Sequence, residues 1–260
     1  MNISDTAAVR DLAAGVPGAT RVFESFGIDY CCGGHRTLAD ACREASLPVE
    51  DLARSLEEAG RASQDAGAEQ DWRQESLTSL AAYIIDKHHQ FTRQELDRLE
   101  KLFDKVCSRH GENHPELIES RKTFYQLKQD LIPHMLKEEQ VLFPYITRME
   151  EAACEGRAIP PPFFGTARNP AQMMMTEHDT AGDLLQQLRG ITKGYTIPPD
   201  GCVSFQTLYQ ALAAFEADLH QHIHLENNVL FPRAIEMEEN SAPDLSKSAG
   251  EFNGHRCFGR

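Results

Sequence analysis

The sequence predicts an all-α protein in which a small helical domain is followed by an up-and-down bundle of four long helices. Three observations lead to this prediction. Apolar residues recur with helical spacing over four long stretches, patterns typical of β-strands are almost absent, and glycine and proline separate the helical stretches. The 260 residues are 41% hydrophobic and 25% charged, as in a globular chain with enough apolar side chains for a core.

Residues 1–59 are expected to form the small domain. Four short helical patterns occur there, and Gly15 and Gly27 end the first two. Residues 60–71 are small and polar without apolar periodicity, so they are predicted to be a linker. The four helical patterns cover Thr6–Ala14, Ala19–Phe26, Thr37–Ala45 and Val49–Ala59.

Residues 72–239 are predicted to be the bundle. Gly111 and the prolines near positions 160 and 198 mark the joins between its helices, and four amphipathic helices joined in this way pack most economically up and down. Residues 240–260 contain few apolar side chains and are expected to be a flexible tail. The four helices are expected at about Gln74–Cys107, Pro115–Glu151, Ala171–Lys193 and Ser204–Glu239.

The chain is acidic, with 26 Lys and Arg against 40 Asp and Glu and a formal net charge of −14. A field of this sign repels phosphate backbones and anionic lipid, so neither nucleic acid nor a membrane is an expected partner. No stretch is apolar for long enough to span a membrane, and the N-terminus lacks the pattern of an export signal. The seven cysteines have no framework spacing, which favours reduced thiols and a cytoplasmic location.

One polar pattern occurs twice in the predicted bundle. The second helix contains His134 and Glu138 in the pattern H-x-x-x-E-x-x-V-L-F-P. The fourth helix contains the same pattern, with His222 and Glu226, at a constant offset of 88 residues. Because residues i and i+4 lie on one face of a helix, each His–Glu pair faces one way.

The first and third helices carry His89 and His178, which lie 45 and 44 residues before the histidines of the repeat. In a bundle of twofold pseudo-symmetry, four imidazoles and two carboxylates therefore converge. Six ligands exceed the three or four of a zinc site, whereas two cations about 3.5–4 Å apart would use all six. Mixed imidazole and carboxylate ligands suit iron, and the residues alone leave manganese open.

Single residues of this kind are more often structural or exposed than metal ligands, and it is the repetition that favours a metal site. His220 and His224 also form an i, i+4 pair, but Asn228 stands where a carboxylate would be needed. Both histidines are therefore expected on the surface. The repeat does not decide between His88 and His89, since either can lie near the apolar stripe of its helix.

Four motifs resemble those of the repair of iron centres (RIC) family, a group of iron–sulfur cluster repair di-iron proteins. The first comes from the small cysteine-bearing domain of that family, and the other three come from its hemerythrin-like domain. The resemblance covers about residues 5–237. The motifs are Gly27-x-Asp29-Tyr30-Cys31-Cys32-Gly33-Gly34, His134-Met-x-Lys-Glu138-Glu-Gln, Glu177-His178-Asp-x-Ala-Gly and His222-Ile-x-Leu-Glu226-Asn-Asn.

The resemblance implies a ligand set and a cofactor. It favours His89 over His88 as a ligand, with Arg93 one turn further on. It also implies that Glu138 and Glu226 bridge two non-heme iron ions, which would be oxo-bridged when oxidised. The full set of expected ligands is His89, His134, Glu138, His178, His222 and Glu226.

Cys31 and Cys32 are adjacent and lack the C-x-x-C spacing of a zinc site. Gly33-Gly34 allows a tight turn, which is expected to leave both thiols accessible. They are either two structural cysteines or, as the resemblance favours, a thiol relay that receives iron or nitric oxide, or passes electrons, at the di-iron centre. The linker would allow their domain to swing.

The resemblance implies a cytoplasmic stress-response protein that repairs iron–sulfur clusters damaged by oxidative or nitrosative stress, by donating iron from a labile centre. Its partners would be damaged or apo iron–sulfur proteins. The same ligands would also serve reduction of nitric oxide, or binding of nitric oxide or oxygen as a scavenger or sensor. The sequence leaves open whether the protein is an enzyme and whether it forms a homodimer.

Overall fold

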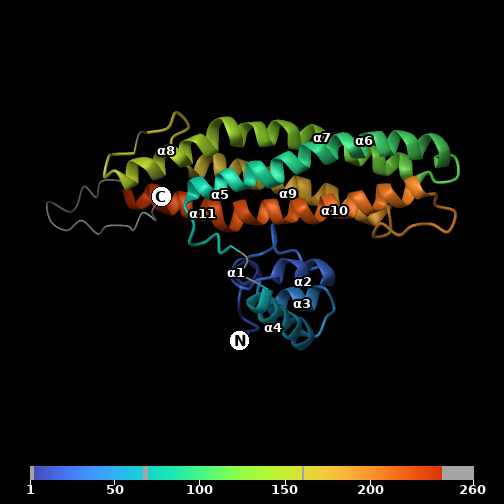
Figure 1. The fold of residues 1–260 in the computed structure, drawn as a ribbon, viewed down its shortest axis with the longest axis horizontal. Helices are drawn as coiled ribbons and strands as arrows, with labels where there is room; N and C mark the ends of the chain where they lie inside the picture. The colour runs from blue at the N-terminus through green and yellow to red at the C-terminus, as the bar shows by residue number, and fades with distance from the viewer. Residues whose placement is uncertain (1–2, 67–69, 160, 242–260) are drawn as a thin grey trace.

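The computed structural model describes residues 3–66, 70–159 and 161–241 of the chain. Four long helical rods lie side by side, and a small helical domain packs against one side of them (Figure 1). The described residues contain no β-strand, so the predicted all-α fold is confirmed. None of the helices within these residues is long and apolar enough to cross a lipid bilayer.

The four rods occupy the stretches predicted for the bundle helices, with ends that differ by a few residues. Three of them are interrupted by a short π-helical segment, labelled η. The first rod is α5 (Leu77–Tyr83), η1 (Ile84–His89) and α6 (Gln90–His110); the second is α7 (Glu116–Lys137), η2 (Glu138–Leu142) and α8 (Phe143–Cys154); the third is α9 (Arg168–Ile191); the fourth is α10 (Val203–Leu225), η3 (Glu226–Leu230) and α11 (Phe231–Ser241).

The prolines of the repeat favour a wider helical turn at two of the three π-helical segments. Pro144 and Pro232 stand just after η2 and η3. Proline has no N–H, and its ring clashes with the carbonyl four residues earlier, so the α-helical hydrogen bond to that carbonyl cannot form. A wider turn accommodates the clash. Glu138 and Glu226 are the first residues of the two segments, so the change of helical pitch lies directly beside the polar positions.

The bundle has two separate apolar cores with a polar layer between them. One core contains Phe103, Phe124 and Phe215. The other contains Leu80, Ile146 and other side chains at the opposite end of the rods. The six predicted ligands lie where these two sets meet on each rod, so they are shielded from solvent at both ends.

The small domain has its own core, built around the buried side chains of Val9, Phe23, Leu38 and Leu56. Its last helix continues through Ala66, seven residues into the segment predicted to be a linker, because no helix-breaking pattern interrupts it there. Residues 67–69, and residues 242–260 of the predicted tail, lie outside the described residues. The domain's helices are α1 (Val9–Gly15), α2 (Ala19–Phe26), α3 (Leu38–Glu44) and α4 (Val49–Ala66).

The small domain packs against α10 and η3. Nδ1 of His220 lies 2.7 Å from the Glu24 carboxylate, and the ring of Tyr30 meets the ring of His224 edge-on at 5.5 Å. The expectation that His220 and His224 are surface residues is therefore wrong: His220 is half-buried and His224 is only 3% exposed. Helical periodicity placed them on the outside of the bundle, but it could not show that another domain covers that side.

We predict that Phe124→Ala lowers the free energy of unfolding by about 3–5 kcal/mol, because Phe124 is fully buried in the larger core. Chemical denaturation followed by circular dichroism measures this loss. Ile118→Ala is the matched control, since Ile118 lies on the same helix with 52% of its surface exposed. The control should change stability by no more than about 0.5 kcal/mol. Equal losses for the two variants would contradict the assignment of this core.

Candidate metal centre

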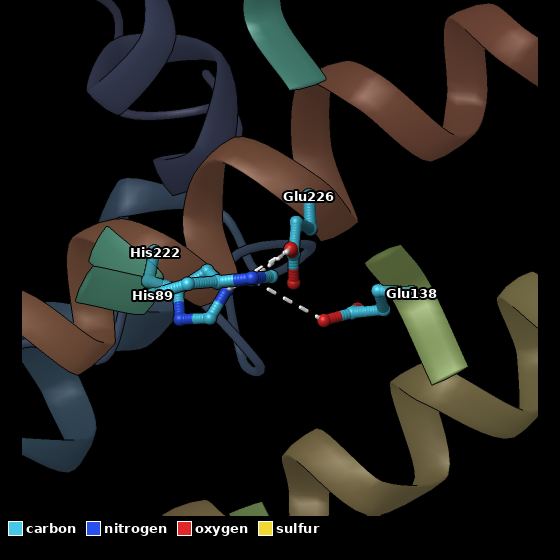
Figure 2. Close-up of side chains that lie close together, drawn as sticks. All are labelled: His89, Glu138, His222 and Glu226. Carbon is cyan, nitrogen blue, oxygen red and sulfur yellow. Dashed lines mark hydrogen bonds and ion pairs between the residues drawn. The ribbon is translucent and has the colours of Figure 1, made fainter. Parts of the chain in front are cut away.

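The six predicted ligands converge in the polar layer, and each is at most 2% exposed. Figure 2 shows His89, His222, Glu138 and Glu226 pointing toward one another from three different rods. His134 and His178 complete the layer from α7 and α9. The structure therefore brings all six side chains together.

The layer consists of two overlapping groups of four ligands. His89 and His222 lie in one group, His134 and His178 lie in the other, and Glu138 and Glu226 belong to both. Within each group, one ligand atom from every residue lies within 4.8 Å of the others. Two carboxylates shared between two pairs of imidazoles form an arrangement that can hold two cations side by side.

The inward nitrogens of the histidines are close together. Nε2 of His89 lies 3.1 Å from Nε2 of His222, and Nε2 of His134 lies 2.9 Å from Nε2 of His178. Glu226 links the two pairs, since its carboxylate oxygens lie 2.9 Å from His222 Nε2 and 3.1 Å from His178 Nε2.

Three histidines are also held by their outward nitrogen, Nδ1. A carboxylate oxygen of Glu139 lies 2.7 Å from Nδ1 of His89, and Glu177 holds His134 in the same way at 2.8 Å. For His178 the partner is the side-chain oxygen of Asn227, also at 2.8 Å. Such contacts fix the ring orientation and direct Nε2 toward the centre.

Sequence reasoning missed these three outer partners, although a signal for two of them was present. Glu139 and Asn227 are separated by the same 88 residues as the ligands, directly after Glu138 and Glu226. The repeat could therefore have identified a position that contacts the facing histidine.

The layer contains two buried carboxylates whose negative charge a bound cation would balance. Both oxygens of Glu138 and one of Glu226 are buried without a hydrogen-bond partner among the described residues. Although burial and mutual repulsion oppose ionisation, the neighbouring imidazoles hold the pKa of both carboxyls below its usual value. Two buried carboxylates with oxygens that lack a hydrogen bond, and that lie 3.1–3.5 Å from imidazole nitrogens, fit a bound metal.

In the absence of metal, protonated histidines balance part of the negative charge of the two carboxylates. Burial lowers the pKa of His89 and of His134, but the carboxylates of Glu138 and Glu226 outweigh it. The resulting pKa is about 10 for His89 and about 9 for His134. Both rings are therefore protonated on both nitrogens, and positively charged, at neutral pH in the metal-free protein.

His88 lies outside both groups of ligands. Its Nδ1 is 3.1 Å from a carboxylate oxygen of Asp218, and its ring stacks on that of His222 with 5.8 Å between the ring centres. The residues alone left His88 and His89 as alternatives. The rotation of the first rod turns His89, and not His88, toward the other ligands.

Cys31 and Cys32 lie at the interface between the small domain and the bundle. Their sulfurs are 3.9 Å apart as free thiols, and the Cys32 sulfur is 3.7 Å from the backbone carbonyl oxygen of His178. Cys31 is only 5% exposed, so the expectation that both thiols are accessible is wrong for Cys31. A hydrogen bond with Cys32, together with burial and the nearby Asp29, raises the pKa of the Cys31 thiol.

The cysteine loop is shaped by Asp29, a residue of the cysteine motif to which the sequence analysis assigned no role. Its carboxylate accepts hydrogen bonds from the backbone N–H groups of Cys31, Cys32 and Gly33, at 3.0, 3.1 and 2.8 Å. Elsewhere in the described residues Cys42, Cys107 and Cys202 are free, as expected. Cys154 is disulfide-bonded, which corrects the expectation of thiols throughout.

A buried layer of histidines and glutamates in a four-helix bundle defines a class of metal-binding protein. Residues 80–234 match the family model of the hemerythrin HHE cation binding domain, and residues 5–60 match a domain of unknown function, DUF542 (ScdA_N). The match and the two ligand groups together support metal binding by this layer.

Relatives with both parts of the chain are iron–sulfur cluster repair proteins YtfE. The protein of that name from Yersinia pseudotuberculosis serotype IB (strain PB1/+) is 34% identical over 227 residues, which are 87% of this chain and 96% of that protein. The one from Edwardsiella ictaluri (strain 93-146) is 36% identical, over 86% of this chain and 95% of that protein. The chain therefore belongs to the hemerythrin family and, within it, to the YtfE family.

We predict that metal binding at pH 7.5 releases about two protons per chain, from His89 and His134, because a metal ion can bind only the neutral imidazoles. The number should fall toward zero as the pH rises above the metal-free pKa values of about 9 and about 10. Titration calorimetry in buffers of different ionisation enthalpy counts the protons. A heat that does not depend on the buffer at pH 7.5 would contradict this charge state.

Proposed function

We propose that this protein repairs damaged iron–sulfur clusters by donating iron from a labile di-iron centre. The observation that carries the proposal is the pair of overlapping ligand groups, in which both carboxylates are shared between two pairs of histidines. Membership of the YtfE family supports the repair role, since its members are named for it.

In this proposal each iron is held by two histidines and both glutamates. His89 and His222 would hold one ion, His134 and His178 would hold the other, and Glu138 and Glu226 would contribute to both. Nitrogen and carboxylate ligands suit iron, and a pair of such ions supplies a change of oxidation state. The two carboxylates offset part of the metal charge, so neutral imidazoles suffice for the remaining positions.

The proposed route to the recipient includes the thiols of Cys31 and Cys32. The position of the Cys32 sulfur against the backbone of His178 supports such a relay. Iron binding would require each thiol to lose its proton, and in the docked domain Cys32 and the Asp29 carboxylate, which lies 3.3 Å from the Cys31 sulfur, raise the pKa of that thiol and oppose this loss. Because Cys31 is covered in the docked domain, delivery to another protein requires the small domain to move away from α10.

The recipients in this proposal are apo or damaged iron–sulfur proteins, and the location is the cytoplasm. Reduction of nitric oxide would use the same ligands, and the fate of the iron distinguishes it from iron donation. Iron leaves the protein during donation, whereas a protein that reduces nitric oxide keeps its iron from one turnover to the next.

We predict that the purified protein, supplied with iron, binds about two irons per chain and that Glu138→Leu/Glu226→Leu removes both, because the bridging carboxylates are lost. Iron analysis together with the visible spectrum provides the measurement. Glu151→Leu/Glu236→Leu is the control, since these two glutamates are exposed on the same two rods. One zinc per chain, or full iron binding by the first variant, would overturn the di-iron proposal.

We also predict that Cys31→Ser/Cys32→Ser retains both irons but loses repair of a damaged iron–sulfur enzyme. A serine hydroxyl is a poor ligand at neutral pH and cannot replace the thiolates that bind iron. Recovery of the enzyme's activity and iron content measures repair. Cys202→Ser serves as the control for loss of a thiol. Undiminished repair by the double variant would exclude the relay and leave the di-iron proposal standing.

A further inference from the structure

The two halves of the metal centre are related by the repeat, but their outer contacts differ at one histidine. Glu139 and Asn227 occupy equivalent positions, and each contacts Nδ1 of a histidine on a neighbouring rod, as described above. Glu177, directly before His178, contacts Nδ1 of His134. The residue equivalent to Glu177 in the other half is His88, directly before His89.

His88 does not provide the contact that Glu177 provides. Its ring lies nearly parallel to the ring of His222, with an angle of 9° between the planes, and it stacks instead of hydrogen bonding. Nδ1 of His222 is buried and has no hydrogen-bond partner among the residues that the structure describes. The four ligand histidines thus differ: His89 and His134 have a carboxylate partner, His178 has an amide, and His222 has none.

His88 also separates His222 from a cavity of about 670 Å³ between the small domain and the bundle. Asp218 and His224 contribute to the wall from α10, and Gly15 and Val16 contribute from the small domain. One face of the His88–Asp218 pair therefore adjoins open space, and movement of the small domain would widen that space.

We propose that the two metal positions differ in strength, and that the metal ion held by His89 and His222 is the labile one that leaves first. A partner on the outward nitrogen of a ligand histidine raises its basicity and fixes its orientation, and loss of such a partner typically lowers metal affinity about 10–100-fold. At the metal position of His134 and His178, both histidines have a hydrogen-bond partner on Nδ1. At the position of His89 and His222, only His89 has one. His88 thus acts through His222: it stacks on this ring without a hydrogen bond to Nδ1, and so keeps the metal affinity of that position low.

The inference rests on the proposed function, because lability has a purpose only if the metal is donated. It adds that a single ion per chain is exchanged readily while the second keeps the layer neutral and folded. It also gives the docked small domain a role, since this domain forms part of the wall beside the labile position.

The test is the rate of iron release from the anaerobically loaded, full-length protein to an excess of a coloured ferrous chelator. The unchanged protein should release iron in two phases of about one ion each. His88→Glu places a carboxylate where the other half has Glu177, so it should slow the fast phase about 10–100-fold and leave the slow phase unchanged. Glu177→His should do the reverse and accelerate the slow phase.

Gln90→Glu is the matched control, because it adds the same charge at an exposed position two residues from His88 and should change neither phase. His88→Gln gives a second, uncharged variant that can accept the His222 N–H, with a smaller slowing of the fast phase. Release of both irons in a single phase, or a fast phase unaffected by both His88 variants, would overturn this inference and leave iron donation standing. A protein that binds no iron would instead overturn the proposed function itself.

Discussion

The burial of two carboxylates beside each other is the constraint on which the rest of this structure depends. Glu138 and Glu226 are both fully buried at the centre of a helical bundle, with no surface exposed to solvent. Such a pair is tolerated only where positive charge is held against it. In the metal-free protein that charge comes from protonated histidines, and in the proposed loaded protein it comes from iron. The imidazoles, the outer partners and the π-helical segments are arranged around this requirement.

The pseudo-symmetry of the bundle is strong at the centre and weaker outside it. The six ligands obey the repeat, since each metal position needs the same donors. On the outer face of α10 and η3, however, His220, His224 and Asn228 contact the small domain, and the amide of Asn228 donates to the backbone oxygens of Tyr30 and Cys31. The equivalent positions on the second rod are Ile132, Leu136 and Gln140. The difference explains why the small domain packs against one side of the bundle only.

The packed small domain also changes how its cysteines should be understood. A thiol pair at the end of a mobile arm would be exposed, whereas here Cys31 is covered and protonated against Asp29. The contacts that hold the domain in place include a half-buried ion pair, Glu24 with His220, and a few hydrogen bonds. An interface of this kind can open without unfolding either part. Packing of this domain and access to the metal layer are therefore coupled through the same face of α10.

Local features of the sequence determined the fold class, the four rods and the set of ligand types, because helical periodicity and i, i+4 spacing are properties of one helix at a time. The repeat of His134 and Glu138 at His222 and Glu226 predicted a shared centre without any structure. Helical spacing alone did not decide which of His88 and His89 faces inward; the family resemblance favoured His89, and the tertiary structure places it there, since that choice depends on how the first rod is rotated and on the π-helical segment that ends at His89. Only the tertiary structure decided the burial of His224 and Cys31, because both depend on where the small domain packs, which no local pattern encodes.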